Sequence, residues 1–370
     1  MATTRTALTP RERVLRAVNR QIPDKVPKDT SWGFTPAVMN TFRQKTGCDD
    51  PDEYFGVEVR FVGLDLPPER IQAAERERRE VFGRYYRELP EDTEITEWGT
   101  AHLPGSFYHF TQLVYPMQSF TTLKEIEAFP LPHFEEDWRL AYAQERIQAF
   151  HRRDLAVCGS MAVTIFEVAW QLRGWEELFT DFRFRPELAA FLLDSLMETR
   201  IRMARFFAEQ DVDVLILGDD VSMQTGMMMS PATWRQWFKE RMRRIIAEAR
   251  AIKPDLPVFY HSDGNPWAII PDLIEIGVTI LNPIQPECID PVAVKQRYGD
   301  RLALWGTIGI QSTMPFGTPE EVRGEVKKRI ETVGYDGGLV LGPTHSLEPE
   351  VPWENIVALY EAIEEYGVYA

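Results

Sequence analysis

The sequence predicts an α/β protein, a single-domain (β/α)8 TIM barrel with an irregular, partly helical N-terminal extension. Short aliphatic runs alternate with long helical stretches in the second half of the chain. Nearly every residue of each run is apolar, as in strands buried on both faces of a parallel sheet. No Gly-x-Gly-x-x-Gly or Walker A pattern follows a run, which argues against a nucleotide-binding open sheet. The runs cover residues 154–160, 213–220, 256–264, 277–285, 301–309 and 337–345.

The first half of the chain gives fewer signals. Thr9, Pro10 and Glu12 form a capping-box pattern, so we expect a helix from Pro10 to about Gln21. Residues 23–132 are rich in prolines and aromatics and show only short amphipathic pieces. A closed barrel therefore needs two further strands from this half.

Helices in the second half are indicated by their caps and by their periodicity. Residues 186–209 carry apolar side chains near helical spacing. Ser230 precedes a proline and predicts a helix over 231–252, and Thr318 begins a second capping box for a helix to about residue 332.

Internal repeats and low-complexity linkers, which would mark separate domains, do not interrupt the sequence. We therefore expect one domain over residues 1–370. In this organisation residues 1–150 are irregular and complete the barrel, and residues 151–370 form the regular β/α units.

Composition limits the classes of partner. Lys and Arg number 41 against 57 Asp and Glu, a formal charge of −16, which disfavours nucleic acid and anionic membrane surfaces. The 3 cysteines are widely spaced and form no Cys-x-x-Cys pair, as expected in a reducing compartment. We find no secretory signal and no apolar stretch long enough to span a bilayer. These features predict a soluble, cytoplasmic protein.

Polar residues gather at the predicted carboxyl ends of the strands, where the catalytic groups of a parallel barrel lie. Each of these side chains follows an aliphatic run directly or within a few residues. They are Glu167, Asp219, Asp220, Gln224, His261, Asp263, Asn282, Gln285 and His345.

His261 and Asp263 form the sharpest local signal. Residues i and i+2 of an extended segment point to the same side, and Gly264 lets the chain turn directly afterwards. The pair could ligate a metal, or act as a general acid in which the carboxylate raises the pKa of the imidazole. Alternatively, the histidine simply hydrogen-bonds the carboxylate and caps the next helix.

Asp219 and Asp220 are adjacent at a strand end, so their carboxylates should point in opposite directions. One can face the pocket as a base or as an acceptor for a substrate hydroxyl. The other can cap a loop.

In this order, these residues resemble the uroporphyrinogen decarboxylase superfamily. The resemblance is collinear over roughly residues 150–370. It implies a single-domain barrel, commonly a homodimer, with its cleft at the carboxyl ends of the strands. The segments that carry it are residues 218–246, 258–286, 298–311, 316–330 and 337–363.

The resemblance implies one of two chemistries. True decarboxylases act on a tetrapyrrole with many carboxylates and bind it through arginines of an N-terminal RQAGRY-like motif. The other branch moves a methyl group between a small molecule and a corrinoid on a separate protein, usually with zinc. Here the corresponding segment, residues 24–47, holds Arg43 as its one arginine, which disfavours the decarboxylase.

The methyltransferase branch often binds zinc through His-x-Cys and a distant Cys. This chain keeps His261 but has Asp263 and His345 near the cysteine positions, a harder set of ligands suited to activating an ether or amine. We therefore expect His261, Asp263 and His345 to act as metal ligands or general acid, with Asp220 as a further catalytic residue. The expected substrate-binding residues are Asp219, Gln224, Asn282, Gln285 and Glu167.

Two alternatives stay open. One is cofactor-free decarboxylation of a tetrapyrrole, and the other is a barrel that binds a small ligand without catalysis. Perturbed acids at the strand ends would argue against the second alternative.

Overall fold

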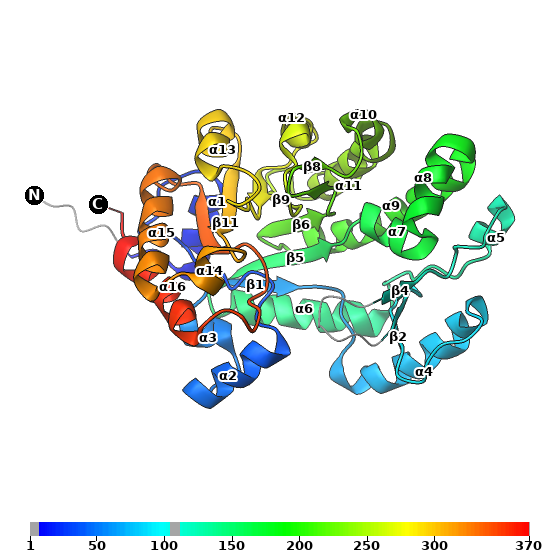
Figure 1. Cartoon of the computed structure of the whole chain (residues 1–370), viewed down its shortest axis with the longest axis horizontal. Helices are drawn as coiled ribbons and strands as arrows, with labels where there is room; N and C mark the ends of the chain where they lie inside the picture. Colours follow the sequence, from blue (N-terminus) through cyan, green and yellow to red (C-terminus); the bar gives the residue numbers. More distant parts are fainter. Residues whose placement is uncertain (1–6, 104–111, 370) are drawn as a thin grey trace, which may run out of the picture.

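The computed structural model describes residues 7–103 and 112–369. Its centre is a curled, seven-stranded parallel sheet with helices on its outer side (Figure 1), in the order β1–β5–β6–β9–β10–β11–β12. Every strand predicted after residue 150 is present, which confirms the α/β barrel class. The strands are β1 (Val59–Val62), β5 (Ala156–Ala162), β6 (Val214–Gly218), β9 (Val258–His261), β10 (Ile280–Asn282), β11 (Ala303–Ile308) and β12 (Leu339–Pro343).

A short segment beside β12 takes the place of the eighth strand. Lys28 forms a parallel bridge with Leu341. The Asp29 amide donates to the Leu341 carbonyl at 3.0 Å, and the Leu341 amide donates to the Pro27 carbonyl at 2.9 Å. The two contributions expected from the first half of the chain are therefore β1 and this segment.

The predicted helices are present, with two differences in extent. α1 (Pro10–Val18) ends before Gln21 because Arg20 adopts a left-handed φ of 59°. The helix expected over 231–252 is divided into α10 (Pro231–Trp234), a π-helical turn (Arg235–Lys239) and α11 (Glu240–Arg250).

Both predicted capping boxes are formed, at Thr9 for α1 and at Thr318 for α15 (Pro319–Thr332). α9 (Pro186–Glu209) packs on α11, and α15 packs on α16 (Trp353–Tyr366). The other α-helices are α2 (Pro36–Thr46), α3 (Pro51–Phe55), α4 (Ile71–Phe82), α5 (Leu123–Glu127), α6 (Asp137–His151), α7 (Phe166–Arg173), α8 (Trp175–Phe184), α12 (Ile270–Glu275), α13 (Pro291–Tyr298) and α14 (Thr313–Phe316). No helix in the described part of the chain is long and apolar enough to cross a membrane.

The irregular first half also contains a small antiparallel sheet that the sequence did not predict. It consists of β2 (Glu94–Ile95), β3 (Ala101–Leu103) and β4 (Gln112–Val114). Such short strands offer too few residues for an alternating pattern to be recognised.

The inside of the barrel is filled by alternate residues of its strands. Val214 and Ile216 of β6 face inward with Phe259 and Trp305, whereas Leu215 and Leu217 face the helices. Every predicted strand is buried on both faces, which explains its continuous apolar pattern.

A carboxyl group, Asp29, is also buried in this interior. Its Oδ2 accepts a hydrogen bond of 2.7 Å from the Trp305 indole, whereas its Oδ1 has no hydrogen-bond partner among the described residues. Burial raises the pKa of Asp29 to about 7.

Replacing Asp29 with Asn should therefore change how stability depends on pH. The pKa of Asp29 is higher in the folded state than in the unfolded state. Its stabilising contribution is thus complete below about pH 4 and is lost as pH rises through about 7. We expect the free energy of unfolding of Asp29→Asn, taken relative to that of the wild type, to rise by about 1–3 kcal/mol when the pH is raised from about 5 to about 8. Urea unfolding at both pH values measures this, and a constant difference would contradict it.

Glu58, which directly precedes β1, links β1 to the segment around Lys28 that takes the place of the eighth strand. Its carboxylate accepts hydrogen bonds from the Lys28 amide at 3.0 Å and from Arg13 Nη1 at 3.2 Å, and the residue is 3% exposed.

Glu58→Ala should lower the free energy of unfolding by about 2–4 kcal/mol, because it leaves a buried amide and part of a buried guanidinium without an acceptor. Glu240→Ala is the control, since Glu240 forms an exposed pair with Arg243 and should matter by less than about 1 kcal/mol. Chemical unfolding of both variants measures the difference. Equal effects would contradict the role of Glu58.

Candidate functional site

The site lies at the carboxyl ends of the central strands, where the register aligns three residues. Gly218 of β6, His261 of β9 and Asn282 of β10 are lateral neighbours in the parallel ladder. A Cβ at Gly218 would stand 2.5 Å from Cβ of His261, so the small residue leaves room for the imidazole. Adjacent strands thus bring the histidine and the amide together.

Asn282 fixes the orientation of the imidazole. The Asn282 Nδ2 donates to the Trp305 carbonyl at 3.1 Å, so its Oδ1 faces the ring and lies 2.6 Å from His261 Nδ1. Nδ1 is therefore the donor, and Nε2 faces the other way. The Trp32 ring lies edge-on to the imidazole, with centroids 5.1 Å apart.

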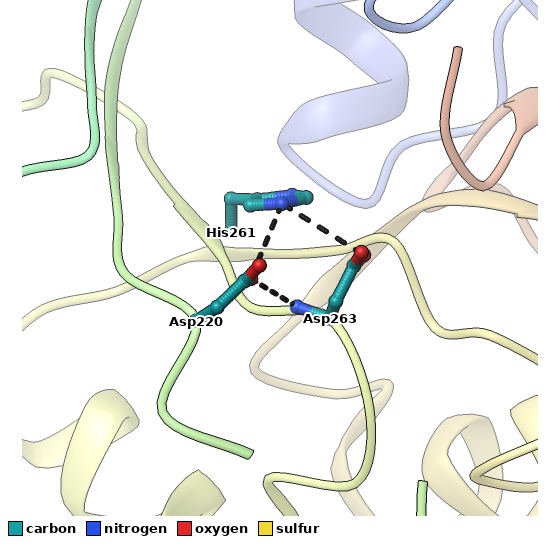
Figure 2. A group of neighbouring side chains, drawn as sticks. All are labelled: Asp220, His261 and Asp263. Atoms are coloured by element: carbon teal, nitrogen blue, oxygen red, sulfur yellow. Dashed lines mark hydrogen bonds and ion pairs between the residues drawn. The ribbon is translucent and has the colours of Figure 1, made fainter. Parts of the chain in front are cut away.

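Two carboxylates converge on His261 Nε2 (Figure 2). Asp220 Oδ1 lies 3.5 Å from it and Asp263 Oδ1 lies 3.8 Å from it. The Asp263 amide also donates to Asp220 Oδ1 at 2.7 Å. The turn that brings Asp263 here passes through Gly264 at φ +80°, where a Cβ would meet the Met223 carbonyl at 2.5 Å.

The electrostatics of this group suit a bound cation. Asp263 Oδ1 is buried and lacks a hydrogen-bond partner among the described residues. Burial, opposed by His261 and reinforced by the charge of Asp220, raises the pKa of Asp263 to about 6. One ligand atom from each of Asp220, His261 and Asp263 lies within 4.8 Å of the others. A nitrogen with a fixed tautomer and two carboxylates form a donor set that fits a divalent metal.

Asp219 and Asp220 point in opposite directions, as the strand geometry predicts. The carboxylate of Asp219 is buried under α7 and accepts hydrogen bonds from the amides of Ile165 at 3.1 Å and Glu167 at 3.0 Å. It therefore holds the loop before α7 instead of facing the cleft. Burial raises its pKa to about 6.

Glu167 joins the carboxylate group from the side of α7. Its Oε2 accepts a hydrogen bond of 2.9 Å from the Asp220 amide. Burial raises the pKa of Glu167 well above its usual value, and the nearby charges of Asp220 and Asp219 raise it further. A carboxyl group with a raised pKa therefore lies beside the group of Asp220, His261 and Asp263.

The remaining predicted residues lie apart from this group. Gln285 Oε1 accepts from the Gly264 amide at 2.6 Å and so secures the turn. Gln224 Nε2 donates to Gln311 Oε1 at 2.7 Å on the exposed rim. His345 is not a member of the metal-ligand group found among the described residues, and Asp220 stands in its place. The reason is topological, since β10 and β11 separate β9 from β12, which precedes His345.

A cavity of about 570 Å³ is lined in part by Trp32. Its lining includes Arg78 from α4 and Arg200 from α9, which sequence reasoning did not select. Neither follows a predicted strand, so strand-end position could not find them. Trp32 follows a segment too short to show a strand pattern, and only the local Trp-Gly pair could have drawn notice.

Comparison with known proteins identifies the family. The model of the uroporphyrinogen decarboxylase (URO-D) family matches residues 110–366. The chain belongs to this family. The match covers all of the segments that carry the resemblance in the sequence.

Curated relatives of this URO-D family member include proteins with two different activities. It is 30% identical over 183 residues to the methylcobamide:CoM methyltransferase MtaA of Methanosarcina barkeri, covering 49% of this chain and 50% of the relative. It is 26% identical over 141 residues to the uroporphyrinogen decarboxylase of Legionella pneumophila (strain Lens), covering 38% of each chain. The chain thus spans about half the length, or less, of these relatives.

A solved structure extends the likeness over the whole fold. A methyltransferase from Methanosarcina mazei aligns with a TM-score of 0.66 and 22% identity, over 97% of this chain and 99% of that chain. At this identity the likeness supports the barrel architecture alone.

Replacing each of the two adjacent aspartates should distinguish their roles. Asp219→Ala removes the acceptor of buried amides at the start of α7, and we expect it to lower the free energy of unfolding by about 2–4 kcal/mol. Asp220→Ala, whose side chain is 34% exposed, should change stability by less than about 1 kcal/mol. Thermal and chemical unfolding measure both. A more damaging Asp220→Ala would overturn this assignment.

Proposed function

We propose that this URO-D family member transfers a methyl group from a small methylated ether or amine to a corrinoid carried by a partner protein. The observation that carries the proposal is the convergence of Asp220 and Asp263 on Nε2 of His261 at the mouth of the barrel. The match to a methylcobamide:CoM methyltransferase supports methyl transfer as the reaction class.

In this proposal Asp220, His261 and Asp263 would hold a divalent metal, with zinc favoured by the mixed histidine and carboxylate donors. His345 is not needed for this set. A bound metal supplies Lewis acidity that polarises the heteroatom of the substrate and weakens its bond to the methyl group. The hydrogen bond from His261 Nδ1 to Asn282 keeps Nε2 directed at the site.

Glu167, beside this set, accounts for the proton that the reaction requires. When the methyl group leaves, the heteroatom keeps the bonding electron pair and becomes more basic. Glu167 lies beside Asp220, and desolvation and the neighbouring carboxylates raise its pKa, so it is the group that would supply that proton to the leaving atom. Asp219 positions Glu167 by accepting a hydrogen bond from its backbone amide.

Decarboxylation of a tetrapyrrole is the second candidate, favoured by the family match and by the decarboxylase relatives. That substrate would need several guanidinium groups in the cleft. The cavity beside Trp32 contains Arg78 and Arg200, and Arg43 pairs with Asp49 on an exposed surface. Two arginines suit a smaller anion better than a polycarboxylate.

The proposal predicts that purified protein binds zinc stoichiometrically and that His261→Ala abolishes the binding. His133→Ala is the matched control, because His133 is exposed and belongs to a different surface. Metal analysis after dialysis measures the loss. Visible spectroscopy of added cob(I)alamin with candidate methyl ethers and amines then measures methyl transfer, which should be lost in His261→Ala and retained in His133→Ala.

Two results would contradict the proposal. One is metal-free protein that decarboxylates uroporphyrinogen. The other is zinc binding and turnover that survive His261→Ala unchanged. The same resemblance that suggests a partner protein also suggests a homodimer, which sedimentation analysis of the purified chain would measure.

A further inference from the structure

The cavity of about 570 Å³ lies between the carboxyl ends of β1 and β5 and the small antiparallel sheet. In Figure 1 the strands β1 and β5 run toward β2 and β4. Residues of the barrel, of α9 and of the N-terminal half thus share its lining. The lining includes Trp32, Phe61, Asp65, Arg78, Ala162 and Arg200.

The register of the barrel relates this cavity to His261. Ala162 pairs with Gly218 and Gly218 pairs with His261, so the three residues form one row across β5, β6 and β9. At the usual strand spacing the cavity wall at Ala162 is about 10 Å from the backbone of His261. Trp32 bridges the gap, since it lines the cavity and contacts the imidazole. A small molecule in the cavity would therefore contact Trp32, whose ring reaches His261.

Arg200 places a buried positive charge in the wall. The residue is 4% exposed, and its guanidinium donates to the carbonyls of Thr164 at 2.9 Å and Val163 at 2.6 Å. A third contact goes to the thioether of Met203 at 3.2 Å. Two of the five N–H groups of a guanidinium remain after these contacts. Although burial lowers the pKa of Arg200 to about 10, the group stays charged at neutral pH.

Carboxylates of the described chain do not neutralise this charge by direct contact. Arg200 is in none of the ion pairs formed by residues 7–103 and 112–369. Asp219 attracts it only over a longer distance, and its oxygens are already bound by the amides that precede α7. A buried charge without an opposite charge beside it is unfavourable, so an anionic ligand that paired with Arg200 would be bound favourably.

The acidic residues of the cavity are already paired or exposed. Asp65 pairs with Arg146 at 2.7 Å, and Glu97 pairs with Arg139 at 2.5 Å. Glu94 is exposed. Arg78, in contrast, has a buried Nε without a hydrogen-bond partner among the described residues. Arg78 and Arg200 are therefore charged groups of the lining that form no ion pair with the described residues.

The rest of the lining is largely aromatic. Trp32 and Phe61 contact each other with centroids 5.7 Å apart, and Trp98 lies under the Arg200 guanidinium at 4.8 Å. Phe134 completes this wall. Flat apolar surfaces beside a guanidinium favour a flat apolar molecule with an anionic end.

We propose that this cavity binds the small-molecule substrate through Arg78 and Arg200, and that the substrate is a flat apolar molecule carrying a single carboxylate. The proposal rests on the proposed function only in naming this molecule as the methyl donor. The pocket itself is defined by its charge and its walls. One end of the ligand meets the two arginines, and its other end lies toward Trp32 and His261.

Calorimetric titration of the full chain with benzoate and with its uncharged analogue benzamide tests the proposal. We expect benzoate to bind at millimolar concentration or below, and benzamide to bind at least about tenfold more weakly. Arg78→Met keeps the length of the side chain and removes its charge. It should weaken benzoate binding by about tenfold or more and leave benzamide unchanged. Arg200→Lys, which keeps the charge but loses the planar fork, should weaken benzoate binding in the same direction.

Arg205→Met is the matched control, because Arg205 lies on the same helix and pairs with Glu248 on the surface. It should bind benzoate as the wild type does. Equal affinity for the two probes, no benzoate binding by the wild type, or full binding by both Arg78→Met and Arg200→Lys would overturn the proposal. The titration uses no corrinoid and no metal. A failure of methyl transfer would therefore leave this result standing, and the reverse also holds.

Discussion

The parallel register of β6, β9 and β10 is the constraint on which the site depends. Because Gly218, His261 and Asn282 occupy one row, the amide of Asn282 reaches the imidazole of His261 without any loop having to bring it there. The residues that follow the same strand ends, Asp220 and Asp263, then fall on the opposite side of the ring. Rigid strands supply this precision more reliably than loops would.

Burial gives this arrangement its chemistry. Two carboxylates and a third acid, Glu167, are held close together and partly buried, which raises the pKa values of Asp263 and Glu167. Such a cluster is unfavourable for stability unless a cation or protons compensate it. Asp219 stabilises the arrangement, because its carboxylate accepts hydrogen bonds from the amides at the start of α7 and so holds α7 to the end of β6. Strain of this electrostatic kind is typical of functional sites.

The two halves of the chain contribute different residues to the site. The regular half supplies Asp220, His261 and Asp263, the candidate metal ligands, from the ends of β6 and β9. The N-terminal half supplies Trp32, Arg78 and Trp98, which enclose the cavity beside it. The acidic net charge of −16 does not oppose an anionic ligand here, because the local cavity carries unpaired arginines.

The sequence by itself determined the barrel class, the strand positions after residue 150, the capping boxes and the strand-end location of His261, Asp220 and Asp263. These features depend on burial and capping patterns that are set by residues close together in the sequence. Tertiary structure alone decided that Asp220 and not His345 joins His261, that Asp219 faces α7, and that Arg78 and Arg200 share one cavity. Those outcomes depend on which strands lie side by side and on contacts between residues far apart in the chain. No local pattern in a single sequence records such contacts.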